Sequence, residues 1–456
     1  MEISPNIFRA YDIRGIVGET LNSDIVKRIG HVLGLMYPDV EKICVGRDGR
    51  LSSNNLAAAL IEGLQDAGKY IYDIGQVPTP VLYFSTHNLK TRSGVMVTGS
   101  HNPPEYNGLK ILMNGNTLSG TLIKDIYEEI CKRDLIFHSG MLQATEVNAQ
   151  YISEITASIE LKRPMRIAID CGNGVAGPLA VTLFKDLGCE VTELYCNVDG
   201  NFPNHPPNPN DIDNLADLIH CVTENNLDIG FAFDGDGDRC IVVDNDGEVL
   251  WPDRQMMLYS VDTLSRNPKA KIVFDVKSSR NLGQVIKENG GEPFMHRTGH
   301  SFIKSKMNEV GAILGGEMSG HIFFNERWYG FDDGLYTASR MLELVSNQKH
   351  ASSDFFKQIP FCPCTPEINI PLEKEEQQYS FMKDFSENAQ FPDAIITDID
   401  GIRVDYPYGW GLLRASNTTP SLVARFEADS ESQLLNIKKE FKQQILKIDS
   451  EIDVPF

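Results

Sequence analysis

Residues 43–75 read ICVGRDGRLSSNNLAAALIEGLQDAGKYIYDIG, and this stretch predicts the fold. An apolar run opens it, and the turn RDGR, an apolar-periodic helix that stops at glycine, and the second apolar run YIYDIG follow. Two strands that flank a helix in this way form a βαβ crossover, in which the strands are parallel. The segment therefore indicates an α/β unit.

The same plan recurs twice along the chain. Residues 167–195 run from IAID through CGNG and a helix ending KDLG to EVTELY, and residues 272–299 run from IVFD through VKSS and NLGQVIKENGG to PFMHRTG. Because βαβ units are common, three copies would also occur in an α/β protein whose domains are unrelated. We favour three similar α/β domains with parallel or mixed sheets.

The chain has 456 residues, which is too long for one hydrophobic core. The residues after 362 lack the βαβ plan and end in a helix-like stretch, which predicts a smaller α+β domain. We expect boundaries near residues 146, 250 and 362, after a polar stretch, after the hairpin IVVDNDGEVL and at the segment FCPC. The expected domains are 1–146, 147–250, 251–362 and 363–456.

Composition excludes several classes of protein. A net charge of −21 argues against sequence-independent nucleic-acid binding, which needs clustered Lys and Arg. No run approaches the roughly 18 apolar residues of a membrane helix, and the start has no apolar core of a signal peptide. Nine scattered cysteines fit a reducing cytoplasm, and Cys362 and Cys364 lack the second pair that a zinc site would need.

A serine stands in the loop TGSHNPPEYNG at residues 98–108. Ser100 follows the apolar run Gly94–Val97, so we expect its hydroxyl exposed at the carboxyl end of a strand, where open α/β sheets place their chemistry. Such a hydroxyl is compatible with many nucleophilic mechanisms. Lys110, in NGLKIL, lies close in sequence and is a candidate proton donor or acceptor.

Three carboxylates stand two residues apart in DGDGDR, namely Asp234, Asp236 and Asp238. They repel one another unless a hard cation such as Mg²⁺ holds them. An EF-hand would need glycine and glutamate where Arg239 and Asn245 stand, so calcium sensing is excluded. The alternative is a solvated acidic turn.

Two further segments carry binding groups. GGEMSGH at residues 315–321 places Glu317, Ser319 and His321 on alternate positions beside glycines, which suits recognition of sugar hydroxyls, although an ordinary turn would look similar. RASNTTP has the composition of a phosphate cradle, although alone it is more often a turn: Arg414, Ser416, Asn417 and Thr418. Other candidates for the same cleft are Arg9, Arg14, Lys277 and His300.

The chain resembles the α-D-phosphohexomutase family, and within it the phosphomannomutase/phosphoglucomutase group. The resemblance covers essentially the whole length through FRAYDIRG at 8–15, TGSHNPPEYNGLK at 98–110, DGDGDR at 234–239, GEMSGH at 316–321 and RASNTTP at 414–420. It implies three similar α/β domains and a smaller fourth around a central cleft. Gly99 stands where many relatives have alanine.

The resemblance also implies roles. Ser100 would carry the phosphoryl group, Mg²⁺ would be bound by the phosphoserine with Asp234, Asp236 and Asp238, and Arg239 would lie beside the reacting groups. Lys110 and His300 would be the general acid and base. Sugar hydroxyls would contact Glu317 and Ser319, and the non-reacting phosphate would contact Arg414, Ser416, Asn417 and Thr418. Tyr11, Arg14, Lys277 and His321 would line the pocket.

The expected reaction is reversible phosphoryl transfer between the 1- and 6-positions of hexose phosphates, with a hexose 1,6-bisphosphate as intermediate and activator. Mannose and glucose remain open as substrates, and a cytoplasmic monomer is expected. The nearest alternative is phosphoglucosamine mutase, whose sugar loop usually has glutamine where Met318 stands. A metal-assisted phosphomonoester hydrolase and a phosphosugar-binding regulator are further alternatives.

Overall fold

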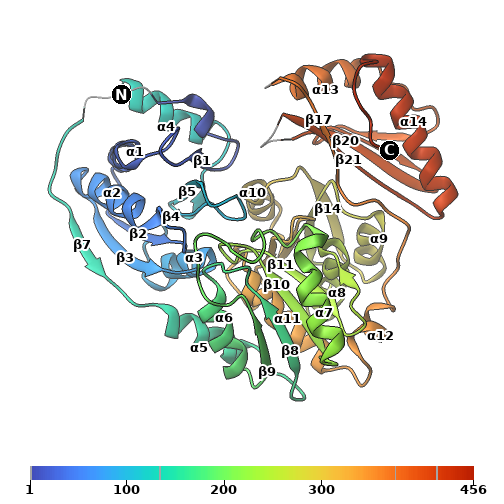
Figure 1. Ribbon diagram of the computed structural model, residues 1–456, viewed down its shortest axis with the longest axis horizontal. Helices are drawn as coiled ribbons and strands as arrows, with labels where there is room; N and C mark the ends of the chain where they lie inside the picture. Colours follow the sequence, from blue (N-terminus) through green and yellow to red (C-terminus); the bar gives the residue numbers. More distant parts are fainter. Residues whose placement is uncertain (1–2, 133–134, 375, 417–419) are drawn as a thin grey trace.

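The computed structural model describes residues 3–132, 135–374, 376–416 and 420–456, and four sheets follow one another along them (Figure 1). In each expected βαβ repeat the two strands are parallel neighbours. The pairs are β2 (Lys42–Arg47) with β3 (Tyr70–Gln76), β8 (Arg166–Asp170) with β9 (Glu190–Leu194), and β13 (Lys271–Asp275) with β14 (Glu292–His296). Three similar α/β units and a different fourth are therefore confirmed.

The first unit has a mixed sheet of order β1-β5-β4-β2-β3-β7, with β6 beside β5. Its edge strand β7 lies in the polar stretch that precedes the expected boundary near residue 146. This strand pairs in parallel with β3. Every residue of β7 is exposed, so its side chains are not part of the buried core of the unit. The other elements are η1 (Pro5–Ile7), β1 (Ile13–Ile16), α1 (Ser23–Met36), α2 (Ser53–Asp66), α3 (Thr79–Asn88), β4 (Gly94–Val97), β5 (Tyr106–Met113), β6 (Asn116–Thr117), α4 (Thr121–Lys132) and β7 (Met141–Ala144).

The second unit has the order β12-β11-β10-β8-β9. Strands β10 and β8 are parallel, and the expected hairpin of β11 and β12 is antiparallel. Its remaining elements are α5 (Asn148–Ser158), α6 (Gly177–Asp186), η2 (Ile212–Leu215), α7 (Ala216–Glu224), β10 (Ile229–Phe233), β11 (Cys240–Asp244) and β12 (Val249–Leu250).

The third unit has the order β14-β13-β15-β16. Its remaining elements are α8 (Pro252–Arg266), α9 (Arg280–Glu288), α10 (His300–Val310), β15 (Leu314–Gly316), β16 (Ile322–Phe324), α11 (Gly334–Ser346) and α12 (Ser352–Phe356). The turn between β15 and β16 carries the GGEMSGH segment, so this turn presents its polar side chains at one edge of the sheet.

The fourth unit is an antiparallel sheet of order β17-β21-β20-β19-β18 with two helices, as the predicted α+β domain requires. The expected last helix is α14, which begins after Ser430. The elements are β17 (Ile368–Pro371), α13 (Gln377–Asn388), β18 (Ile395–Thr397), β19 (Ile402–Tyr406), β20 (Gly409–Ala415), β21 (Ser421–Ala428) and α14 (Glu431–Ile448).

Apolar packing joins the first three units but leaves the fourth with a core of its own. One continuous cluster includes Phe84 of α3 and Trp328 of the third unit, whose rings stack. The fourth unit contacts the third through polar and apolar groups: Arg403 donates to the carbonyls of Val276 (2.7 Å) and Ser278 (2.9 Å), and Val276 also packs in a small apolar cluster with Trp410 and Leu412. Figure 1 shows the first and fourth units at opposite ends, with the other two between them.

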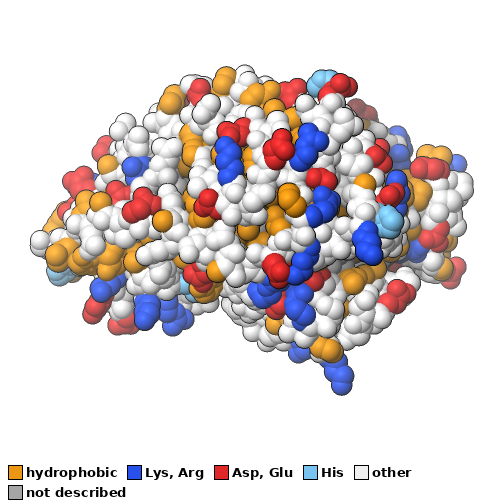
Figure 2. All heavy atoms as spheres, turned by 90° about the horizontal axis from the view of Figure 1, so that it is seen from below, with side chains coloured by type: hydrophobic (Ala, Val, Ile, Leu, Met, Phe, Trp, Pro, Cys, Tyr) orange, Lys and Arg blue, Asp and Glu red, His pale blue; other side chains and the backbone are white. Residues whose placement is uncertain are grey.

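On the face seen in Figure 2, Lys and Arg side chains are interspersed with Asp and Glu side chains, and no extended patch has one sign. Among the described residues, no helix has the length and apolar character that crossing a bilayer would require.

Candidate active site

The serine loop leaves the first sheet at the carboxyl end of β4, as predicted, but its hydroxyl is not exposed. Ser100 is 2% exposed, because the turn between β10 and β11 of the second unit covers it. A Cβ placed on Gly235 of that turn would lie 2.4 Å from the Ser100 carbonyl oxygen. Our expectation of an exposed hydroxyl is therefore wrong: a second domain closes over the strand end, which the sequence of the loop does not reveal.

Ser100 is held in an uncommon conformation and contacts an acid. Its φ angle of 48° is in the left-handed region, which non-glycine residues rarely adopt. Its Oγ donates to Oδ2 of Asp234 over 3.0 Å and lies 3.2 Å from Nδ1 of His101. The serine of the first unit and the acidic turn of the second unit thus form one site.

Arg14 lies against the serine loop. Its Nη1 donates to the Gly99 carbonyl (2.5 Å) and to Oδ1 of Asn102 (2.5 Å), and its Nη2 pairs with Asp12. Its Nε is buried and has no hydrogen-bond partner among the described residues. Arg14 therefore supports the loop and keeps one donor free at the site.

The three carboxylates of the DGDGDR turn are fully buried and converge. Asp234, Asp236 and Asp238 each have an oxygen within 4.8 Å of the others. Lys110 of β5 donates through Nζ to Oδ2 of Asp236 (2.7 Å) and also to Asp238. The cluster is therefore not a solvated acidic turn.

Electrostatics at the cluster favour a bound cation. Burial, together with the charges of Asp236 and Asp238, raises the pKa of Asp234 to about 8. Oδ1 of Asp236 is buried without a hydrogen-bond partner among the described residues. Carboxylate oxygens in this arrangement are ligands that a hard divalent cation prefers, so the residues fit such an ion.

His321 links the acidic turn to Glu317 and Ser319 of the GGEMSGH segment. Its Nε2 lies 3.2 Å from Oδ1 of Asp238, and its Nδ1 lies 2.9 Å from Oγ of Ser319 and 3.3 Å from Oε2 of Glu317. Burial alone would lower the pKa of His321, but the Asp238 and Glu317 carboxylates together outweigh burial and raise this pKa to about 9. Arg239 approaches the same imidazole, with Nε 3.2 Å from Nε2.

His300 begins α10 and belongs to a buried polar group. Its Nδ1 lies 3.1 Å from Oδ2 of Asp332, whose Oδ1 accepts from Lys304 Nζ over 2.9 Å. Burial lowers the pKa of His300, and Asp332 opposes that shift only in part. The His300 ring stacks on His321 at 5.4 Å and contacts Tyr11 edge-on at 5.7 Å. The structure thus brings Tyr11, His300 and His321 together.

The two candidate phosphate-binding cations are buried and are each paired with an acid. Lys277 donates through Nζ to Oε1 of Glu367 (2.5 Å), and Arg414 donates through Nε to Oδ2 of Asp400 (3.1 Å). Nη2 of Arg414 is buried without a partner among the described residues. Ser416 is buried at the end of β20, and Asn417 and Thr418 lie outside the described residues.

Several residues of the site were missed at the sequence level. Thr79, the first residue of α3, donates through Oγ1 to Oδ2 of Asp236 over 2.6 Å. Asp332 lies in FDDG, where the adjacent acidic residues gave a signal that we did not use. The RDGR turn holds the serine loop but was interpreted only as a turn. For Thr79 no local signal exists, since its partner is 157 residues away.

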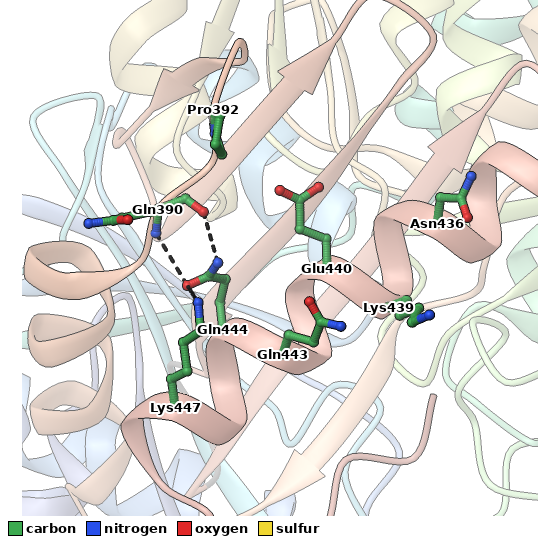
Figure 3. Close-up of a pocket in the computed structure, with 8 residues that line it drawn as sticks. All are labelled: Gln390, Pro392, Asn436, Lys439, Glu440, Gln443, Gln444 and Lys447. Carbon is green, nitrogen blue, oxygen red and sulfur yellow. Dashed lines mark hydrogen bonds between the residues drawn. The ribbon is translucent and has the colours of Figure 1, made fainter.

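A separate shallow pocket lies on the outer side of the fourth unit, between α14 and the segment around Gln390 (Figure 3). Gln444 and Gln390 are hydrogen-bonded to each other across it. None of the candidate site residues lines this pocket, whose walls are Gln390, Pro392, Asn436, Lys439, Glu440, Gln443, Gln444 and Lys447.

Comparison with known families identifies four successive domains of one enzyme family along the chain. Residues 5–136, 149–247 and 251–361 match the alpha/beta/alpha domains I, II and III of phosphoglucomutase/phosphomannomutase, and residues 367–444 match its C-terminal domain. The matches follow one another in the order of the four sheets.

Individual proteins agree with the domain matches. The phosphomannomutase/phosphoglucomutase of Pseudomonas aeruginosa is 50% identical over 453 residues, which are 99% of this chain and 98% of that protein. A phosphoglucomutase of Neisseria gonorrhoeae is 48% identical over 97% of both chains. The crystal structure of a phosphoglucomutase/phosphomannomutase family protein from Burkholderia thailandensis superposes with a TM-score of 0.94 and 44% identity, and 100% of each chain is covered.

Proposed function

The chain belongs to the phosphoglucomutase/phosphomannomutase family, and we propose that it interconverts the 1- and 6-phosphates of mannose, glucose or both through a phosphoserine at Ser100. The observation that carries the proposal is the hydrogen bond from Ser100 Oγ to Asp234, which places the nucleophile at a buried cluster of three carboxylates. This family membership and the acidic cluster agree with a metal-dependent phosphohexomutase.

Phosphoryl transfer depends chiefly on positioning and on neutralising the charge of the phosphoryl oxygens. Asp234, Asp236 and Asp238, with an oxygen of the phosphoserine, would hold Mg²⁺, which supplies much of that neutralisation when it is bound. Lys110 reaches the same carboxylates and places a further positive charge there, and Arg239 lies 3.7 Å from Oδ2 of Asp234.

His300 suits the role of general base. Its imidazole is buried, its pKa is lowered so that it is neutral near pH 7, and Asp332 orients it. In the forward step, the bond between the phosphorus and the serine oxygen breaks as a bond to the sugar hydroxyl oxygen forms. The hydroxyl proton passes to His300, and Lys110 is the candidate donor of a proton to the departing serine oxygen. When the other phosphoryl group returns to Ser100, both proton transfers run in reverse.

A mutase must treat both ends of the sugar alike. The hexose 1,6-bisphosphate made in the first step would turn over within the site and return its other phosphoryl group to Ser100, and added bisphosphate would activate dephosphorylated enzyme. Glu317 and Ser319 would bind hydroxyls while Tyr11, Arg14 and His321 line the pocket. The non-reacting phosphate would be held by Lys277, Arg414, Ser416, Asn417 and Thr418.

The domain boundaries that we propose are 1–146, 147–250, 251–362 and 363–456. A monomer fits the site, because one chain supplies all its described groups. A cytoplasmic location fits the cysteines, all nine of which are free.

Ser100→Ala tests the proposal directly. We expect the variant to lose turnover between hexose 1- and 6-phosphates by about 10³-fold or more, because alanine has no hydroxyl to carry the phosphoryl group. The assay contains Mg²⁺ and a catalytic amount of glucose 1,6-bisphosphate. Substantial activity in Ser100→Ala under these conditions would contradict a phosphoserine mechanism.

A further inference from the structure

Arg50 lies beneath the serine loop, in the turn that follows β2. Strands β2 and β4 are parallel and Arg47 pairs with Val97, so the turn after β2 and the loop after β4 leave the sheet at the same edge. The Arg50 side chain is fully buried. No role in the mechanism above is assigned to it.

Every N–H of the Arg50 guanidinium donates a hydrogen bond to Asp48 or to the serine loop. Nε donates to Oδ2 of Asp48 (3.2 Å), and the two terminal nitrogens donate to four backbone carbonyls of the serine loop. The carbonyls are those of Ser100 (2.8 Å), Asn102 (2.5 Å), Pro103 (2.5 Å) and Tyr106 (2.9 Å). A guanidinium has five N–H donors in a rigid planar fork, and here each finds an acceptor.

Asp48 completes this arrangement on the amide side of the loop. Its Oδ2 accepts from the Gly99 N–H over 3.0 Å, and its Oδ1 accepts from the backbone N–H of Arg50 over 3.0 Å. The guanidinium lies flat against the loop, because a Cβ on Gly99 would lie 2.3 Å from Arg50 Cζ. Glycine at this position therefore has a packing reason in this chain.

We call Arg50 and Asp48, with their hydrogen bonds to the serine loop, the clamp. The clamp and the DGDGDR turn of the second unit both contact the Ser100 carbonyl. Arg50 Nη2 donates to that oxygen, and the backbone of Gly235 abuts it closely. Ser100 also has a positive φ, a conformation that persists only where the surroundings fix it. The position of this carbonyl thus decides whether Ser100 Oγ points at Asp234.

The second unit seals the clamp from solvent. The ring of Phe202 lies 5.0 Å from Arg50 Cζ, which is a cation–π contact. A Cβ on Gly49 would lie 2.2 Å from Cγ1 of Val198, so the loop of the second unit packs directly on the RDGR turn. Because the Arg50 side chain is fully buried, a carbonyl that Arg50 releases loses its hydrogen bond inside the protein, which is costly.

We propose that Arg50, with Asp48, is a positioning residue that fixes the serine loop, so that Ser100 Oγ stays aimed at Asp234 as the phosphoryl group arrives and leaves. This inference rests on the proposed function, since it takes Ser100 as the phosphoryl carrier. Arg50 reaches none of the groups proposed to bind the sugar. It therefore acts on kcat and on the phosphorylation of Ser100, and it leaves KM for the hexose phosphate nearly unchanged.

Arg50→Lys keeps the charge but offers at most three donors without the planar fork. We expect kcat to fall about 10²-fold while KM changes by less than about threefold, because a small misplacement of a nucleophile has a large effect on rate. The rate at which glucose 1,6-bisphosphate phosphorylates Ser100, followed by peptide mass, falls by the same factor. A kcat within about twofold of the unmodified protein would overturn the proposal.

Arg340→Lys is the matched control. Arg340 is fully buried in α11, donates to Asp262 over 2.8 Å, and lies outside the site, so this variant should keep its kcat. Equal losses of kcat in both lysine variants would also overturn the proposal, because the loss would then reflect a missing buried arginine as such.

If Arg50→Lys does not fold, Asp48→Asn decides, since it weakens the same clamp without changing size. A reduced kcat with an unchanged KM supports the clamp, and an unchanged kcat overturns it. The unmodified protein separates the two proposals: if it never accepts phosphate on Ser100, the proposed function fails, whereas normal phosphorylation with an unaffected Arg50→Lys variant refutes the clamp alone.

Discussion

Asp332 contacts both His300 and Lys304, and these contacts affect the orientation and the pKa of the His300 imidazole. Its carboxylate lies 3.1 Å from His300 and 2.9 Å from Lys304, and both Asp332 and His300 are buried. The charge of Asp332 raises the pKa of His300 against the larger lowering effect of burial. Asp332 therefore both orients the imidazole and adjusts the pH at which it becomes a base.

Asp332→Asn should shift the acid limb of kcat/KM to lower pH. If His300 is the base, we expect kcat/KM of the unmodified protein to rise with pH as His300 loses its proton, at a pKa below the ordinary value of 6.5. Removing the carboxylate charge lowers that pKa further, so the limb moves down while the plateau falls about tenfold because orientation is lost. The measurement is a profile of kcat/KM from pH 4.5 to 8.5, and an unmoved limb would show that His300 is not the base.

Residue-level prediction from sequence succeeded where the chemical groups are close in the chain. The three aspartates two residues apart and the serine loop could be assigned because their types and spacing already suggest chemistry. Arg50 and Asp332 were missed because their partners, though in the same unit, lie far from them along the chain. Thr79 was missed because its partner is brought near only by the packing of separate units. The burial of Ser100 escaped prediction for the same reason.

Helix α3 of the first unit contacts the DGDGDR turn of the second unit. Its first residue, Thr79, donates two hydrogen bonds to Asp236. The backbone N–H donates to the Asp236 carbonyl over 2.9 Å, and the hydroxyl donates to the Asp236 carboxylate over 2.6 Å. The start of this helix therefore fixes one of the proposed metal ligands through its backbone and its side chain.

Thr79→Val removes only the hydroxyl. We expect the Mg²⁺ concentration for half-maximal activity to rise about tenfold, since groups that orient metal ligands have effects of this size. Thr79→Ser should restore it. Thr86→Val in the same helix is the control, because Thr86 is equally buried and its hydroxyl donates to the Tyr83 carbonyl. An unchanged Mg²⁺ requirement in Thr79→Val would mean that Asp236 needs no support from α3.

At the level of elements, the βαβ repeats were predictable because alternating apolar runs and glycine stops are local features. Strand β7 was not, because its pairing with β3 uses backbone groups while its side chains face solvent. The turn that carries Lys277 shows the same limit. Its sequence does not tell that Arg403 of the fourth unit donates to the two carbonyls beside it.

The molecule as a whole is three units with continuous apolar packing and a fourth with a core of its own, which meets the third through polar contacts and one small apolar cluster. The fourth unit supplies Arg414, whose Nη2 is buried and has no partner among the described residues, and Asp400 accepts both from Arg414 and from the Thr298 N–H. We therefore assign to this unit the recognition of the phosphate that does not react.

Arg414→Ala should act on binding more than on chemistry. We expect KM for glucose 1-phosphate to rise about 10- to 100-fold, as the loss of a charge-assisted contact predicts, with a smaller change in kcat. Lys439→Ala is the control, since Lys439 lies on the outer side of the same unit (Figure 3). An unchanged KM in Arg414→Ala would place the phosphate elsewhere.

In the proposed reaction, Ser100 transfers its phosphoryl group to the sugar. The most direct measurement is a single turnover in which the protein, labelled with ³²P on the Ser100 peptide, is mixed with glucose 1-phosphate and Mg²⁺. We expect the label to leave Ser100 and to appear in glucose 1,6-bisphosphate and glucose 6-phosphate. Label that is released as inorganic phosphate, or that stays on the protein while product forms, would contradict the account.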